Sequence, residues 1–201
     1  MTSDHYASAS EQEADKTRPP LTGLRFHSPS QLYSTMPALP QMTQLRPHEN
    51  EAGLEFLYRL RGSTTPEEAV TFSAFAAMPK MAVWWGYECL RQSVETFSPQ
   101  DRAVMEMIAV WTSYPDDANR FRIMQTALYA PVRSPAVYMG LAVGWSGGGI
   151  APNDPTPVPA HRTPRAINTA ILSSLARLDL NKRSVWLARF IDLAVPLFRP
   201  Y

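Results

Sequence analysis

The sequence has little of several residue types, and each shortage excludes a class of protein. A single cysteine, Cys89, in 201 residues excludes an internal disulfide framework. The richest apolar runs, residues 81–90 and 138–145, are far shorter than the roughly 20 residues that cross a bilayer. The formal net charge is only +1, which argues against a strongly basic nucleic-acid-binding protein.

The start of the chain also lacks the features of a secretory signal. It begins Met-Thr-Ser-Asp-His-Tyr, with no basic segment and no apolar segment after it. One thiol and no signal together predict a soluble cytoplasmic protein with no membrane insertion.

Proline, in contrast, is abundant, with 19 residues against nine glycines. Six prolines and three of the four histidines fall in residues 1–50, where aliphatic residues are few. We predict that residues 1–50 form a flexible or partly docked N-terminal arm, with the polar residues 7–16 mobile. The residues expected to dock this arm onto the domain are Leu24, Phe26, Leu32, Tyr33 and Leu39.

Residues 51–201 have the pattern of a helical domain. Four Ser/Thr-Pro pairs predict helix starts, because the hydroxyl can accept a free backbone N–H and the proline that follows has no N–H to leave unpaired. These pairs are Thr65-Pro66, Ser98-Pro99, Ser134-Pro135 and Thr163-Pro164. Apolar residues recur between them at helical spacing, and residues 81–90 are apolar on nearly every side, as in a central helix. No stretch alternates as a strand would. We predict a single all-α domain of about seven helices, with a proline-rich loop at 150–163.

The most conspicuous motif is the turn Gly144-Trp145-Ser146-Gly147-Gly148-Gly149. Its first five residues match G-x-S-x-G, the serine motif of α/β-hydrolases, and Asp154 and His161 follow in the order of a triad. That motif needs a strand before the serine, whereas a helical pattern precedes this one. We therefore expect the turn to end a helix, with a serine hydrolase and an anion-binding nest of N–H groups as alternatives.

A second motif is the segment Val83-Trp84-Trp85-Gly86-Tyr87-Glu88-Cys89-Leu90-Arg91. Glu88 and Arg91 are three residues apart and are expected to pair on a helix. A carboxylate among aromatic rings can act as an acid or base, but a structural role is the favoured interpretation. Cys89, in mid-helix, is expected to be inert. The candidate binding or structural residues of the two motifs are Trp84, Trp85, Glu88, Arg91, Trp145, Ser146, Gly147 and Gly148.

No metal site, cofactor or catalytic residue is expected. His161 is the only histidine after residue 50, and no Cys or His pair has ligand spacing. Seven Lys and Arg against two Asp follow residue 160, which predicts a solvated face or a basic docking surface for an acidic partner. No nucleic-acid-reading motif accompanies this charge.

Two blocks of sequence carry a resemblance: Ala82-Val83-Trp84-Trp85 with Cys89 and Arg91, and Trp145-Ser146-Gly147-Gly148 followed by Ile150-Ala151-Pro152 and Ala166-Ile167-Asn168. On these residues the chain resembles an uncharacterised bacterial family whose members share a Trp-Trp helix, a Trp-Ser-Gly-Gly-Ser turn, an Ala-Pro-Pro segment and a closing helix pair. The resemblance spans residues 60–195, with Gly149 in place of the serine and Asn153 in place of the second proline. It implies no activity, but the family's association with type VI secretion clusters implies an accessory or adaptor role.

These observations favour a non-enzymatic cytoplasmic adaptor that binds another protein. Its candidate contacts are the proline-rich loop and the basic last helices. One alternative is a small-ligand binder or hydrolase that uses the turn at residues 145–149 beside Glu88 and Arg91. Another alternative is an immunity or antitoxin protein.

Overall fold

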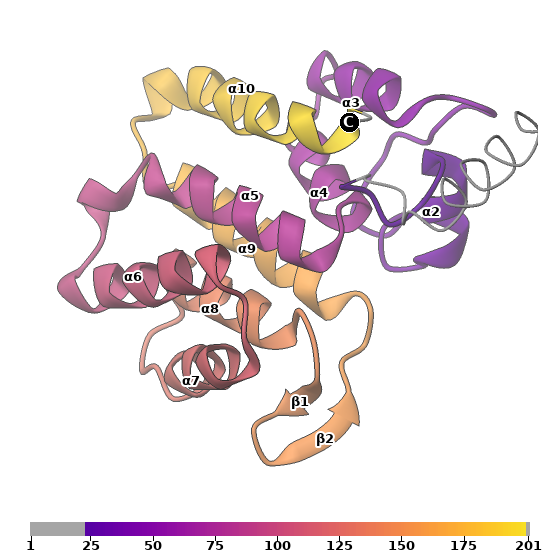
Figure 1. The fold of residues 1–201 in the computed structure, drawn as a ribbon. Helices are drawn as coiled ribbons and strands as arrows, with labels where there is room; N and C mark the ends of the chain where they lie inside the picture. Colours follow the sequence, from indigo (N-terminus) through magenta and orange to yellow (C-terminus); the bar gives the residue numbers. More distant parts are fainter. Residues whose placement is uncertain (1–22, 200–201) are drawn as a thin grey trace, which may run out of the picture.

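The computed structural model describes residues 23–199 and shows a mostly helical chain (Figure 1). This confirms the all-α class. The described residues contain nine α-helices, eight of them after residue 51, where about seven were expected. The elements are α2 (Pro29–Thr35), α3 (Gly53–Arg61), α4 (Glu67–Ala76), α5 (Pro79–Arg91), η1 (Val94–Thr96), α6 (Pro99–Ser113), α7 (Asp117–Leu128), α8 (Pro135–Trp145), β1 (Gly149–Ala151), β2 (Asp154–Pro157), α9 (Arg162–Leu175), η2 (Leu180–Lys182), α10 (Arg183–Ala194) and η3 (Val195–Phe198). Residues 7–16, expected to be mobile, lie outside the described part.

Ser98-Pro99 and Ser134-Pro135, the two Ser-Pro pairs after residue 50, cap helices as the sequence predicts. The Ser98 hydroxyl accepts the amide N–H of Asp101 at 3.1 Å at the start of α6. The Ser134 hydroxyl accepts the amide N–H of Val137 at 3.2 Å at the start of α8. In each case the following proline occupies the first turn, where its missing N–H costs no hydrogen bond.

The two Thr-Pro pairs also lie at helix starts, but their hydroxyls do not cap these helices, so only the capping part of the prediction is wrong. The Thr65 hydroxyl donates to the Glu68 carboxylate at 2.9 Å, and α4 begins only at Glu67. Thr163 lies inside the first turn of α9, where its hydroxyl donates to the carbonyl of Trp145 at 2.6 Å. The Thr65 hydroxyl thus binds a side chain three residues on instead of a backbone N–H, and the Thr163 hydroxyl binds a residue that local sequence does not reveal.

Helices α8 and α9 form the centre of the domain. Helix α8 packs against α6, α7 and α9, while α9 also packs against α4 and α5 (Figure 1). Helix α5, expected to be buried on nearly every side, buries Trp85 but leaves Lys80 and Trp84 exposed. Its outer face is therefore a surface of the protein.

The described residues before α3 pack onto the helical core. Leu32 and Leu39 are 1% and 0% exposed, and Leu24 forms an isolated antiparallel bridge with Ala77. The buried Glu68 carboxylate accepts the amide N–H groups of residues 44 and 45 at 2.9 and 3.1 Å. This carboxylate fastens the segment to α4.

A short antiparallel hairpin occupies the proline-rich loop, although no strand was expected. Gly149 pairs with Pro157, and Ala151 pairs with Asp154 (Figure 1). A Cβ atom on Gly149 would lie 2.2 Å from the Asp154 carbonyl oxygen, so only glycine allows the strands to approach this closely. The Asp154 carboxylate accepts the amide N–H of Thr156 at 2.9 Å, and all residues of β2 are exposed.

Candidate functional site

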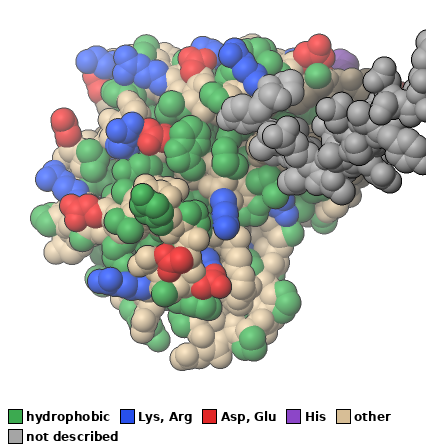
Figure 2. Space-filling view, viewed as in Figure 1, with side chains coloured by type: hydrophobic (Ala, Val, Ile, Leu, Met, Phe, Trp, Pro, Cys, Tyr) green, Lys and Arg blue, Asp and Glu red, His purple; other side chains and the backbone are tan. Residues whose placement is uncertain are grey.

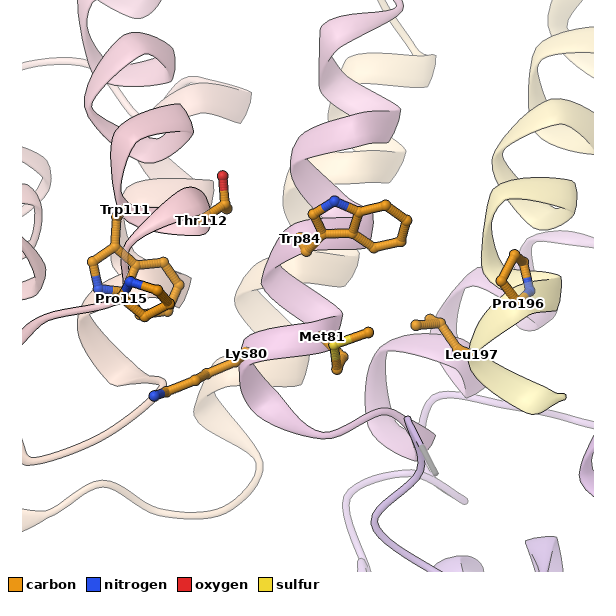
Figure 3. Close-up of a pocket in the computed structure, with 8 residues that line it drawn as sticks. All are labelled: Lys80, Met81, Trp84, Trp111, Thr112, Pro115, Pro196 and Leu197. Atoms are coloured by element: carbon orange, nitrogen blue, oxygen red, sulfur yellow. The ribbon is translucent and has the colours of Figure 1, made fainter. Parts of the chain in front are cut away.

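A surface groove runs across the outer face of α5. Its cavity measures about 440 Å³. The residues that line it, hereafter the α5 groove, are Lys80, Met81, Trp84, Trp111, Thr112, Pro115, Pro196 and Leu197. Figure 3 shows α5 between the end of α6 and η3, with Trp84 and Met81 on its open face. Figure 2 shows hydrophobic side chains gathered in the middle of the same face.

A second hollow of about 330 Å³ adjoins this groove and shares Lys80, Trp111 and Pro115 with it. Its other lining residues are Asp116, Asp117, Arg120, Ser146 and Gly147. The two cavities place Trp84, from one motif, and Ser146 and Gly147, from the other, on adjacent parts of one surface. The amino group of Lys80 extends toward Trp111 and Pro115, where the cavities meet (Figure 3).

The two tryptophans of α5 have different surroundings. Trp84 is 37% exposed and lines the α5 groove. Trp85 is fully buried, and its indole Nε1–H donates to the carbonyl of Phe190 at 3.0 Å. Trp85 therefore joins α5 to α10, while Trp84 is available to a ligand.

Glu88 and Arg91 form an ion pair at 2.6 Å, and neither lines the α5 groove or the hollow beside it. The Glu88 carboxylate, by accepting this hydrogen bond, raises the pKa of the Arg91 guanidinium. Cys89, on the same helix, is fully buried, and burial raises the pKa of its thiol well above the ordinary value. A buried neutral thiol is a poor nucleophile.

The glycine-rich turn ends α8, and side chains satisfy the last carbonyl groups of this helix. The Ser146 hydroxyl donates to the carbonyl of Val143 at 2.7 Å. The Arg120 guanidinium donates to the carbonyls of Gly144 at 2.9 Å and Gly147 at 2.6 Å. The Val143 carbonyl also accepts the amide N–H of Ser146 at 3.1 Å, whereas the buried carbonyl of Gly144 depends on Arg120 because the helix has ended. The turn thus presents carbonyl oxygens to a cation, the opposite polarity to an anion nest.

Arg120 is a central residue of this site that the sequence motifs did not reveal. Its side chain is 5% exposed, lies 4.3 Å from the Phe121 ring centroid and pairs with Asp117 at 3.0 Å. Gly148 has φ of +66°, and a Cβ atom there would lie 2.4 Å from an Arg120 guanidinium nitrogen. The glycine therefore makes room for the arginine. The helical position of Arg120 on α7 carries no signal that it reaches α8.

No hydrogen bond joins Ser146, Asp154 and His161 within residues 23–199. The Ser146 hydroxyl donates to its own helix, and the Asp154 carboxylate accepts from Thr156. His161 lines a third hollow, of about 350 Å³, between α8 and α9. The residues that line it, hereafter the α9 hollow, are Tyr138, Leu141, Trp145, His161, Arg162, Arg165, Ala166 and Thr169.

Trp145 forms a fixed wall of the α9 hollow. Its indole Nε1–H donates to the carbonyl of Ile150 at 3.0 Å, and its own carbonyl accepts the Thr163 hydroxyl. The Arg162 guanidinium lies 5.2 Å from the ring centroid. The indole hydrogen bond and the guanidinium contact hold the ring in place, and the Thr163 hydroxyl holds the backbone of Trp145.

Within the described residues, no group of three or more His, Cys, Asp or Glu side chains is placed to hold a metal ion. In the same part of the chain, no helix has both the length and the apolar character needed to span a membrane.

Neither the curated proteins nor the solved structures contain a match to this sequence. A family model does match, over residues 56–198. Because this match covers most of the chain, the protein belongs to the family of unknown function DUF6931.

Proposed function

We propose that this protein is a non-enzymatic adaptor that binds a segment of another protein in the α5 groove. The observation that carries the proposal is the exposed indole of Trp84, which lines an apolar cavity together with Met81 and Leu197. Tryptophan is enriched among the residues that dominate binding energy at protein interfaces. An exposed apolar hollow of this kind favours a protein or peptide ligand.

The lining residues indicate the chemistry of the bound segment. The ring of Trp111 is nearly buried at the side of the groove, and its indole N–H already donates to the Asp116 carbonyl at 3.1 Å, so this group is not available to a ligand. Lys80 is exposed and has no ion-pair or hydrogen-bond partner within residues 23–199. An acidic residue of the partner would complement this charge. The inferred segment carries aliphatic or proline side chains next to an Asp or Glu.

The contacts of Ser146 support a non-enzymatic role. Its hydroxyl satisfies a helix carbonyl, and no histidine is hydrogen-bonded to it within the described residues. A serine nucleophile needs an adjacent base to remove its proton. If the chain had esterase activity that Ser146→Ala abolished, this part of the proposal would be wrong.

The proposed setting is the cytoplasm, where the protein would act as an accessory component of type VI secretion. This setting comes from the resemblance carried by the Trp-Trp helix and the Trp-Ser-Gly-Gly turn, both of which lie within the matched residues 56–198. The same resemblance implies a role beside other proteins rather than an enzymatic one.

Partner capture with matched variants tests the proposal. The tagged full-length chain would be used to capture proteins from the source cell, alongside Trp84→Ala, Lys80→Glu and the control Tyr58→Ala. Tyr58 is 45% exposed on α3 and does not line the groove, so its removal matches Trp84 in exposure. The identified partner would then be titrated against each purified variant by calorimetry.

We expect Trp84→Ala and Lys80→Glu to weaken binding of the same partner while Tyr58→Ala does not. Loss of a central aromatic anchor costs about 2 kcal/mol or more, which corresponds to a roughly 30-fold higher Kd. Circular dichroism spectra would establish that each variant is folded. A partner bound equally by all three variants, or no stoichiometric partner at all, would contradict the proposal.

A further inference from the structure

Among residues 23–199, those that line the α9 hollow include basic groups along one side and no acidic group. Arg162, Arg165 and His161 line it, and neither Asp nor Glu is among its lining residues. Within residues 23–199, neither guanidinium forms a hydrogen bond or an ion pair, and Arg162 only stacks on Trp145. Most other arginines of the described chain, such as Arg59 with Glu51 and Arg183 with Glu67, do have a carboxylate or carbonyl partner.

The position of these two arginines is unfavourable in the absence of a ligand. They are three residues apart in the first turn of α9, so two like charges face each other on one side of a helix. The start of a helix carries a partial positive charge, which favours acidic residues, yet this first turn contains none. A bound anion would relieve both repulsions.

The surrounding charges in the described part of the chain do not supply this anion. Arg25 approaches the start of α9 and donates to the Ala160 carbonyl at 3.5 Å, which adds a third cation to the region. The Asp154 carboxylate, on the hairpin, is engaged by the Thr156 amide and hydroxyl. The region therefore has an excess of positive charge.

The other side of the hollow is apolar and rigid. The ring of Trp145 is fixed by the hydrogen bond to Ile150, and Leu141 and Tyr138 lie beside it along α8. A volume of about 350 Å³ is that of a small-molecule site. The hollow thus combines an aromatic wall with two guanidinium groups that are unpaired within residues 23–199, and such groups are suited to bidentate contact with a carboxylate or phosphate.

We propose that the α9 hollow is a binding site for an oxyanion, a carboxylate or a phosphate monoester, carried on an aromatic or aliphatic body. The anionic group binds Arg162 and Arg165, and the body packs on Trp145 and Leu141. This site is separate from the α5 groove, so it stands whether or not a partner binds there.

The test titrates small probes into the full-length protein labelled with ¹⁵N. The probes are phenyl phosphate and benzoate, with phenol as the neutral control and inorganic phosphate as the control without an apolar body. The signal is the indole N–H resonance of Trp145, identified by its loss in Trp145→Phe. We expect both aromatic anions to shift this resonance in a saturable manner, and both control probes to bind at least tenfold more weakly.

Three variants determine which side chains bind the anion. Arg165→Gln removes an exposed guanidinium that makes no hydrogen bond or ion pair within residues 23–199, so we expect the fold to stay intact. Arg162→Gln removes the stacked guanidinium. Arg189→Gln is the control, because Arg189 makes the same kind of stack on Trp186, at 4.8 Å on α10, away from the hollow. Each of the first two should raise the Kd for phenyl phosphate about 10- to 100-fold, as expected for a lost charged hydrogen bond, and the third should leave it unchanged.

Several results would overturn the proposal. If Arg165→Gln bound phenyl phosphate as tightly as the natural chain does, the hollow would not be an anion site. If phenol bound as tightly as phenyl phosphate, the hollow would be an apolar site without a preference for anions. If inorganic phosphate bound as tightly as phenyl phosphate, the apolar body of the ligand would not contribute to binding. If a phosphotyrosine peptide competed with phenyl phosphate, the site would be supported and its ligand would be a side chain of another protein. If phenyl phosphate bound and the peptide did not, the site would be supported and its ligand would be a free small molecule.

Discussion

Arg120→Ala should destabilise the protein by about 3 kcal/mol, because one buried side chain completes the end of α8. The buried carbonyl of Gly144 loses its charged donor, and an unsatisfied buried acceptor costs about 1–3 kcal/mol. The carbonyl of Gly147 belongs to an exposed residue and can bond to water, so its loss adds little. The stack on Phe121, at 4.3 Å, adds about 0.5–1 kcal/mol.

The ion pair of Arg120 with Asp117 should contribute almost nothing to this total. The Asp117 side chain is 84% exposed, and exposed ion pairs are screened by water. Asp117→Ala is therefore the matched control, with an expected loss of less than about 0.5 kcal/mol. Arg122 is exposed on the same helix, so Arg122→Ala is the control for the loss of an arginine side chain as such.

The measurement is equilibrium urea unfolding followed by circular dichroism and tryptophan fluorescence. For a chain of this size, 3 kcal/mol corresponds to a fall in Tm of roughly 6–12 °C. The m-value should stay constant, because the substitution changes the native state rather than the surface exposed on unfolding. A loss below about 1 kcal/mol for Arg120→Ala, or an equal loss for Asp117→Ala, would refute this account of the turn.

Two further predictions concern Gly148 and Cys89. Gly148→Ala should cost about 1–3 kcal/mol, because φ is +66° and the new Cβ would displace Arg120, whereas Gly147→Ala, whose Cβ meets nothing closer than 3.9 Å, should cost much less in the same urea experiment. Because burial raises the pKa of Cys89 above that in the unfolded chain, the unfolded thiol ionises first as the pH rises, so stability should fall above about pH 9. Cys89→Ala should remove that component of the alkaline loss, and a difference in stability between the two chains that does not change from pH 8 to pH 10.5 would contradict the assignment. Native Cys89 should also react with a thiol reagent only after unfolding.

The helical class of this chain could be predicted from local signals. Spacing of apolar residues marks a helix face wherever it occurs, and Ser98 and Ser134 cap α6 and α8 through groups within three residues. The threonines at 65 and 163 have equally good local signals, but their hydroxyl groups have other partners: that of Thr65 donates to the Glu68 carboxylate three residues on, and that of Thr163 to the distant carbonyl of Trp145. The hairpin was missed because prolines in β2 hide any alternating pattern, and its close approach depends on Gly149.

The candidate site was predictable only in part. Trp84, Ser146 and Gly147 are unusual in the sequence and line adjacent cavities, yet nothing local distinguishes Trp84 from the buried Trp85. Helix packing decides which of two neighbouring side chains faces solvent. Arg120 illustrates the same limit, since its contacts are with residues 24 and 27 positions away.

The hairpin has a consequence for how copies of this protein behave together. An exposed strand edge with free N–H groups is a template on which another chain can add a strand. Along β2, Pro155 and Pro157 have no N–H, and that of Thr156 is bound to the Asp154 carboxylate. Three consecutive residues of this edge therefore offer no free donor. The prolines that make the strand hard to recognise in the sequence also protect the folded protein against edge-to-edge aggregation.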